Sequence, residues 1–323
     1  MTPKPDNDAI VRDIESFASA LHVESVVFEG EGDFCRAYTV NSDWIFRFAY
    51  NDEGSRSLEC EATLLPKLAP TLTIPIPNIK YFGHRSETNL AFVGYPKIHG
   101  EPSTYDGFMA LEPVRRIQCA NDMVLFLQQL HAFSLDDARA MGVPECDYPF
   151  CRTEEGITEG SAGEIYRREL ALLTNHPRLS TYLDDATRKQ VLASCIELVL
   201  ALLASPQPGD LPPALVHGDL SGEHILLDTD KKQIAGVIDF TDVVITTPVL
   251  DFMYLTEAYG TDFMLSVMQF YGVPNSKDTG SLVWRLHRWH TVLRLLWALD
   301  HDDQPLAERR ASELLRDSNS IET

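Results

Sequence analysis

Two aspartates and a histidine between residues 215 and 251 have the types and spacing that phosphoryl transfer requires. Asp219 follows His217 and Gly218, His224 lies five residues after Asp219, and Asp239 ends an apolar run twenty residues after Asp219. The apolar runs predict a hairpin that folds the second carboxylate back over the loop carrying the first. One carboxylate can then orient an acceptor hydroxyl and accept its proton. The other, with a nearby oxygen or nitrogen ligand, can hold Mg²⁺ on the β- and γ-phosphates of a nucleotide.

This order of residues is a variant of the protein-kinase catalytic loop. In detail, HGDLSGEHIL and GVIDF resemble the aminoglycoside phosphotransferase family, with its pattern H-G-D-L-x-x-x-N-[IVL]-L followed by G-[IVL]-I-D-[FW]. His224 replaces the family's usual Asn, which resembles the aminoglycoside 2″-phosphotransferase and macrolide phosphotransferase branches. The resemblance covers about residues 24–300. It implies that Asp219 is the catalytic residue and contacts the substrate, and that His224 and Asp239 bind Mg²⁺.

The resemblance also implies a nucleotide site before residue 100. Gly30 and Gly32, in GEGDF, match the loop that covers the phosphates, although a plain hairpin turn fits this segment too. Arg47, on the strand WIFRF, stands where the family has a lysine for the α- and β-phosphates. Its planar fork also binds phosphate, and the alternative is an exposed strand arginine. Glu61 is the expected partner of that cation, with Glu59 as the competitor on another helix face.

The segment FVGYPKIHG resembles the hinge between the lobes of a kinase. The resemblance assigns base binding to the Pro96 carbonyl and the Ile98 N–H, and proline has no N–H to offer. Ile238, directly before Asp239, completes the expected nucleotide-binding residues. The alternative for the hinge is an edge strand that ends at the proline.

Two acids downstream point to the acceptor. Glu257 and Asp262 resemble the substrate-facing acids of the 2″-phosphotransferases, and solvated charges on a helix face are the alternative. The net charge of −21 favours an acceptor with several ammonium groups and disfavours a nucleic-acid partner.

We therefore predict an antibiotic kinase that transfers the γ-phosphate of ATP or GTP to an aminoglycoside hydroxyl of the 2″ type and confers resistance. The alternatives are a macrolide phosphotransferase, a kinase of a choline-like or sugar-like metabolite with the same fold, and a non-catalytic nucleotide-binding protein.

Hydrophobic periodicity places helices near residues 8–21, 56–69, 120–132 and 186–204, and short β-rich runs between residues 25 and 96. With the resemblance, this predicts an α+β, two-lobed protein-kinase-like fold. Residues 1–95 form a small antiparallel-sheet lobe that binds nucleotide, and residues 96–323 form a larger, mainly helical lobe that carries catalysis and acceptor binding. Residues 133–163 are predicted to be a long connection. Asp251 is expected to tie down the catalytic loop through charge-assisted hydrogen bonds.

The six cysteines form no C-x-x-C pair, and the two nearest in sequence, Cys146 and Cys151, lie five residues apart. This disfavours a zinc site and a disulfide scaffold, and predicts reduced, buried thiols. The N-terminus has no basic segment followed by an apolar run, and no stretch approaches 18 apolar residues. We expect a cytoplasmic monomer without a signal peptide or a membrane span, whose partners are small molecules.

Overall fold

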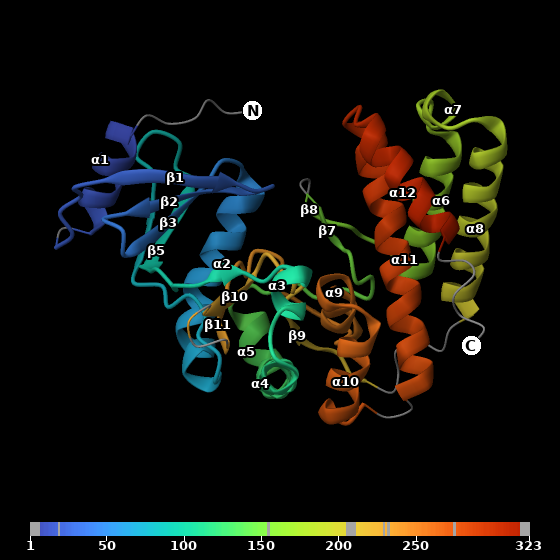
Figure 1. Ribbon diagram of the computed structural model, residues 1–323. Helices are drawn as coiled ribbons and strands as arrows, with labels where there is room; N and C mark the ends of the chain where they lie inside the picture. The colour runs from blue at the N-terminus through green and yellow to red at the C-terminus, as the bar shows by residue number, and fades with distance from the viewer. Residues whose placement is uncertain are drawn as a thin grey trace.

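The computed structural model describes residues 7–18, 20–153, 156–204, 211–228, 230, 233–273 and 276–316. A β-sheet with two helices forms one end of the molecule, and a group of long helices forms the other (Figure 1). Small hairpins and helices lie between them. This mixed architecture, with an N-terminal antiparallel sheet and a helical C-terminal region, agrees with the predicted fold class.

The N-terminal part contains one sheet and three helical segments. Its elements are α1 (Asn7–Phe17), β1 (Val26–Glu31), β2 (Cys35–Val40), β3 (Trp44–Ala49), α2 (Asp52–Leu68), the 3₁₀ turn η1 (Ala69–Thr71), β4 (Tyr81–His84) and β5 (Ala91–Pro96).

The five strands pair antiparallel in the order β1-β2-β3-β5-β4. β4 is an edge strand, as the prolines before it predict. Aromatic residues of the sheet pack against α1, in a cluster that includes Ile10, Ile14, Phe46 and Phe92. The other core cluster includes the buried side of α2 and extends into the helical part. Residues of the sheet therefore pack with α1 in one cluster and with α2 in the other.

The C-terminal part is mainly helical and carries short strand pairs. Its helices are α3 (Tyr105–Met109), α4 (Pro113–His131), α5 (Leu135–Ala140), α6 (Ala162–Asn175), α7 (Leu179–Tyr182), α8 (Asp185–Ala204), α9 (Val249–Tyr259), α10 (Thr261–Tyr271), α11 (Ser276–Asp300) and α12 (Gln304–Arg316). Its strands are β6 (Glu101–Pro102), β7 (Arg152–Thr153), β8 (Gly156–Ile157), β9 (Ala214–Val216), β10 (Ile225–Asp228), β11 (Gln233–Val237) and β12 (Val244–Thr246).

Two strand pairs flank the segment that contains Asp219 and Asp239. β9 and β12 pair antiparallel, and β10 and β11 form the expected hairpin. β6 adds to the free edge of β10 directly after the chain has left the large sheet. The loop between β9 and β10 is thus held at both ends by hydrogen-bonded strands.

The segment 133–163, predicted to be a long connection, has secondary structure of its own. It contains α5 and the strand pair β7–β8. The helix forms because the Ser134 side chain accepts a hydrogen bond from the Asp137 N–H and because Ala138 is buried against the core. Six residues are too short for a helical period to be recognised in the sequence.

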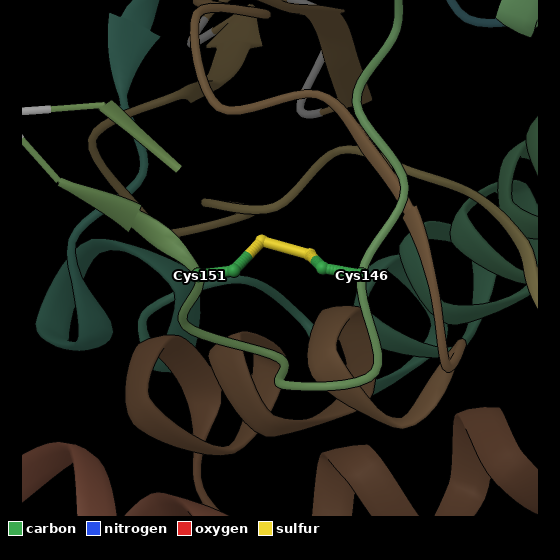
Figure 2. The surroundings of a disulfide bond; sticks show 2 residues. All are labelled: Cys146 and Cys151. Atoms are coloured by element: carbon green, nitrogen blue, oxygen red, sulfur yellow. A yellow bond between two sulfur atoms is a disulfide. The ribbon is translucent and has the colours of Figure 1, made fainter. Parts of the chain in front are cut away.

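The prediction that all six thiols are reduced is wrong for two of them. Cys146 and Cys151 form a disulfide, with a Cα–Cα distance of 6.6 Å (Figure 2). The Cys146 N–H donates to the Ile245 carbonyl, and the Cys151 carbonyl accepts from the Thr158 N–H. Backbone hydrogen bonds to other segments thus hold both cysteines of the loop in place. The other four cysteines are buried thiols, as expected. Reduced cysteines therefore no longer support the predicted cytoplasmic location.

Within the described part of the chain, no helix is both long and apolar enough to cross a bilayer.

Candidate active site

The loop with Asp219 is tied to the start of α9. Asp251 is fully buried, and its carboxylate accepts the backbone N–H groups of His217 at 3.1 Å and Gly218 at 3.2 Å. His131 of α4 lies 3.1 Å from the same carboxylate through Nε2. Gly218 has φ +87°, and an added Cβ would lie 2.1 Å from the Asp242 carbonyl oxygen, so this turn requires glycine. Asp251 therefore fixes the backbone on which Asp219 stands.

We expect Asp251→Ala to lower the free energy of unfolding by about 2–5 kcal/mol, because two buried N–H groups and a buried imidazole lose their acceptor. Denaturant titration of the purified protein measures this. Glu257→Ala, which removes a partly exposed acid of the same helix, is the comparison. A loss no larger in Asp251→Ala than in Glu257→Ala contradicts the anchoring role.

His217 supports this loop and is not the base that would take a proton from an acceptor hydroxyl. It is fully buried, and its Nε2 lies 3.0 Å from the Ile238 carbonyl, to which it must donate. Its Nδ1 then accepts from the Asp219 N–H at 3.3 Å. Burial lowers the pKa of His217, which favours this neutral form. His217 thus links the Asp219 loop to the strand end that precedes Asp239.

Asp219 is a partly buried carboxylate beside an imidazole. Burial raises its pKa, and the attraction of His224 and His217 offsets part of that rise. A raised pKa makes a carboxylate a stronger proton acceptor near neutral pH. One of its oxygens lies 3.3 Å from His224 Nδ1.

The orientation of His224 is set by the same loop. Its Nδ1 lies 2.8 Å from the Asp219 carbonyl oxygen, which can only accept, so Nδ1 carries the proton in the neutral ring. Nε2 then presents a lone pair, 3.7 Å from Asp239 Oδ2. Burial lowers the pKa of His224, but the Asp239 and Asp219 carboxylates outweigh it and the pKa is raised. A proton and a metal ion would therefore compete for the lone pair of His224 Nε2.

Asp239 follows β11 in the left-handed region, with φ +62°. Burial raises its pKa, but Arg47 and then His224 outweigh burial and hold the pKa well below its usual range. The carboxylate is therefore charged at any physiological pH.

His224 Nε2 and Asp239 Oδ2 face each other as two candidate metal ligands. No group of three or more His, Cys, Asp or Glu side chains suited to a metal ion occurs among the described residues. Two protein ligands fit Mg²⁺, which keeps several waters and binds substrate phosphates through its remaining positions.

Arg47 of β3 joins the sheet to this loop. Its Nη1 donates to both oxygens of Glu61 at 2.9 and 3.0 Å, and its Nη2 donates to Asp239 Oδ1 at 2.7 Å. Burial lowers the pKa of Arg47, but the Asp239 and Glu61 carboxylates raise it well above its ordinary value. Arg47 is buried, which disagrees with the alternative of an exposed strand arginine. Glu59 is exposed and contacts Ser55 and His84 instead.

The other expected nucleotide residues lie around this network. Gly30 lies in β1 opposite Ala37, and Gly32 lies in the turn to β2; an added Cβ on either would meet nothing within 4 Å. Pro96 ends β5 opposite Trp44. Ile98 packs on β11, where a Cβ on Gly236 would come within 2.7 Å of its Cγ2.

The backbone of Ile238 is hydrogen-bonded to both histidines of the Asp219 loop. Its N–H donates to the His224 carbonyl at 2.9 Å, and its own carbonyl accepts from His217.

The two acids expected to face the acceptor have different surroundings. Glu257 is ion-paired with Arg294 at 2.6 Å and His290 at 3.0 Å. Burial raises its pKa, but these two partners outweigh burial and lower the pKa to about 2. Asp262 is exposed in the first turn of α10, where a carboxylate stabilises the helix N-terminus. The charge of Glu257 is thus already compensated by Arg294 and His290. The position of Asp262 is explained by its stabilising effect on the N-terminus of α10.

Tyr254 of α9 lies beside His290 of α11. Burial raises the pKa of Tyr254 well above its ordinary value, and the charges of Asp219, Asp242 and Glu257 add to the rise. The Tyr254 ring meets His290 edge-on, with centroids 5.4 Å apart, and Phe150 stacks on His290 with centroids 5.5 Å apart. Phe150 belongs to the loop that the disulfide closes.

Sequence reasoning missed several residues of this site. Thr241 lies two residues after Asp239 and contacts Arg47, Glu61 and Asp239. His131 and His290 come from helices far away in the sequence. No local spacing connects any of them to the motif, and only the two-residue distance of Thr241 from Asp239 could have drawn attention to it.

The geometry agrees with comparisons to known proteins. Residues 30–282 match the model of a family described as the phosphotransferase enzyme family, APH. The solved GDP and kanamycin complex of APH(2″)-IIIa is similar with a TM-score of 0.80 and 26% identity, over 97% of this chain and 99% of that chain.

Two more distant structures share the fold. ADP-bound aminoglycoside phosphotransferase APH(2″)-Ib has a TM-score of 0.69 and 18% identity, over 97% of each chain. The macrolide 2′-phosphotransferase MphH from Brachybacterium faecium has a TM-score of 0.62 and 21% identity, over 98% of each chain.

The family match covers most of the chain and includes the loop of Asp219, His224 and Asp239. The chain therefore belongs to the APH phosphotransferase family, and it is a phosphotransferase with that family's kinase-like fold.

Proposed function

We propose that this protein transfers the γ-phosphate of ATP or GTP to a hydroxyl of an aminoglycoside, at the 2″ position, and thereby confers resistance. The observation that carries the proposal is the convergence of Asp219, His224 and Asp239 with the Arg47–Glu61 pair. Phosphoryl transfer needs a residue at the acceptor, ligands for a metal and a cation for the phosphates. All three kinds of group meet here.

The nucleotide is proposed to bind between a small lobe, residues 1–95, and a larger lobe, residues 96–323. Arg47 holds the α- and β-phosphates, and Glu61 fixes the direction of its guanidinium group. Gly30 and Gly32 leave room over the phosphates, while Pro96, Ile98 and Ile238 line the base end of the site. The similarity to a GDP complex at 26% identity supports a nucleoside diphosphate as the product that remains after transfer.

His224 Nε2 and Asp239 Oδ2 are proposed to hold Mg²⁺. The bound ion supplies positive charge to the phosphate oxygens and thereby favours phosphoryl transfer. His224 contributes a lone pair because the Asp219 carbonyl keeps its proton on Nδ1. Asp239 contributes a carboxylate that Arg47 keeps ionised.

Asp219 is proposed to orient the acceptor hydroxyl and to accept its proton. Burial raises the pKa of this carboxyl group and makes it a better acceptor than an exposed aspartate. Asp251 and His217 hold the backbone of the loop, so the carboxylate is preorganised before the acceptor arrives.

The charge of the chain supports a cationic acceptor. A protein of net charge −21 attracts a ligand with several ammonium groups. The kanamycin complex of the 26%-identical relative supports the same class of acceptor. We propose that the protein acts as a monomer on small molecules, in the cytoplasm where nucleoside triphosphates are made.

The direct test is steady-state turnover of kanamycin, gentamicin and a macrolide, each with ATP and with GTP. Phosphorylation of an aminoglycoside, with the product mapped by NMR to the 2″-oxygen, is the expected result. Efficient turnover of the macrolide without turnover of any aminoglycoside rejects the proposal. It would favour the macrolide activity that the similarity to MphH also allows.

Glu257 and Arg294 should have opposite effects on acceptor binding. Glu257→Gln leaves Arg294 and His290 without their carboxylate, and the uncovered positive charge repels a cationic acceptor. Arg294→Gln releases the carboxylate and attracts the acceptor. We expect the KM for kanamycin to rise about 2- to 5-fold in the first variant and to fall by a similar factor in the second, the scale of partly exposed ion pairs.

The nucleotide KM is the internal control and should stay unchanged in both variants. Asp262→Asn is the comparison for an exposed acid, with a smaller effect on the KM for kanamycin. The effects of Glu257→Gln and Arg294→Gln should shrink as ionic strength rises. A change of the kanamycin KM in the same direction in both variants excludes this electrostatic role.

A further inference from the structure

Thr241 lies at the point where the sheet, α2 and the Asp239 loop meet. Its side chain is 4% exposed. Its backbone carbonyl accepts from the Ser57 hydroxyl of α2 at 2.8 Å, which fixes the residue against the helix that carries Glu61. Because threonine is branched at Cβ, its hydroxyl has few directions once the backbone is fixed.

The Thr241 hydroxyl touches all three charged groups of the network. Its Oγ1 accepts from Arg47 Nη2, donates to Asp239 Oδ1, and lies 3.3 Å from Glu61 Oε1. A hydroxyl has one proton and two lone pairs. It can therefore satisfy the arginine and one carboxylate at once, and Asp239 is the nearer of the two carboxylates.

These contacts give the two oxygens of Asp239 different surroundings. Oδ1 receives the Arg47 guanidinium, the Thr241 hydroxyl and, at 3.4 Å, the Thr241 N–H. Oδ2 lies 3.7 Å from His224 Nε2, on the side proposed for the metal. The donors on Oδ1 thus set the rotation of the carboxylate that presents Oδ2 to His224.

We propose that Thr241 is a positioning residue of the phosphoryl-transfer site, whose hydroxyl joins Arg47, Glu61 and Asp239 into one unit and directs Asp239 Oδ2 toward His224. The inference rests on the proposed roles of Arg47, His224 and Asp239. It explains how an arginine is accommodated where the resemblance implies a lysine. A guanidinium has a second terminal nitrogen that needs partners when it is buried. Thr241 and Asp239 supply them.

The test is the binding of Mg²⁺–GDP and Mg²⁺–ADP to the apo protein, measured by isothermal titration calorimetry. Thr241→Val keeps the shape of the side chain and removes the hydroxyl. We expect it to raise the Kd of the Mg²⁺–nucleotide by about 10- to 100-fold, the scale of one hydrogen bond to a charged group. Thr241→Ser restores the hydroxyl and should stay within about 3-fold of the wild type.

Two further measurements separate positioning from a general loss of structure. The thermal midpoint of each apo variant is recorded, and the Kd of the nucleotide is repeated in EDTA, where the change should be smaller. Thr246→Val is the matched control, because the buried Thr246 hydroxyl has no hydrogen-bond partner among the described residues. Thr241→Ala carries the same expectation as Thr241→Val and replaces it if the valine variant does not fold.

A double-mutant cycle tests the link to the arginine. Lysine has a single terminal nitrogen, so in Arg47→Lys the loss of the Thr241 hydroxyl should weaken Mg²⁺–nucleotide binding less than it does beside Arg47. An equal loss in both backgrounds overturns the link, and so does a smaller loss beside Arg47.

The outcomes distinguish this inference from the proposed function. If the wild type binds Mg²⁺–nucleotide, and Thr241→Val binds it within about 2-fold of the wild type, Thr241 has no positioning role. The same conclusion follows if Thr241→Ser is as weak as Thr241→Val. If the wild type binds neither nucleotide, the proposed function fails, and this inference fails with it.

Discussion

Asp219→Asn is expected to reduce kcat by about 10²- to 10⁴-fold, the contribution of a positioned acid–base group. The amide has the shape of the carboxylate but cannot accept the proton of the acceptor hydroxyl. The Asp219 backbone contacts to His217 and His224 are independent of this change, so the loop should keep its structure. Steady-state kinetics with kanamycin and the preferred nucleotide measures the loss.

Nucleotide binding provides the control for this variant. Arg47, Glu61 and Asp239 form their own network, and Asp219 is outside it. The Kd of Mg²⁺–nucleotide should therefore stay close to that of the wild type. Retention of more than about half of the wild-type kcat shows that Asp219 is not the proton acceptor.

Asp239→Ala should weaken Mg²⁺–nucleotide binding by more than about 100-fold, because loss of an outer partner of a metal site already costs roughly 10- to 100-fold. The change removes the charge of the proposed ligand and also the partner of Arg47 Nη2. Titration calorimetry with and without Mg²⁺ separates the two effects. The metal-dependent part of the affinity should disappear.

His224→Asn is the graded comparison for the metal site. An Asn amide oxygen can bind Mg²⁺, and oxygen is the ligand type that this ion prefers. We expect this variant to retain measurable Mg²⁺-dependent binding. If it binds Mg²⁺–nucleotide as weakly as Asp239→Ala does, His224 has a role other than that of an exchangeable ligand.

The parts of the site that could be predicted are those close together in sequence. Asp219, His224 and Asp239 lie on one loop and the end of one hairpin, so their spacing and the flanking apolar runs were sufficient to bring them together. The β-rich N-terminal part and the long amphipathic helices were recognisable for the same reason. Local periodicity does not depend on the partner element.

The parts that could not be predicted are contacts between distant elements. His131 reaches Asp251 from α4, and Ser57 reaches Thr241 from α2. Which side chains meet there depends on how whole helices pack, and no short pattern encodes that. The disulfide was missed for another reason, since the five-residue spacing of Cys146 and Cys151 is not a recognisable pattern for pairing.

The contact between Arg47 and Asp239 joins residues that are 192 positions apart. On the ribosome, a chain grows at about 5–20 residues per second, so Arg47 precedes Asp239 by roughly 10–40 s. During that interval the small sheet can form, but the arginine, Glu61 and Ser57 lack their partners from the later segment. The site for nucleotide is therefore completed late in synthesis. A nascent chain is expected to bind nucleotide only after the segment with Asp239 has left the exit tunnel.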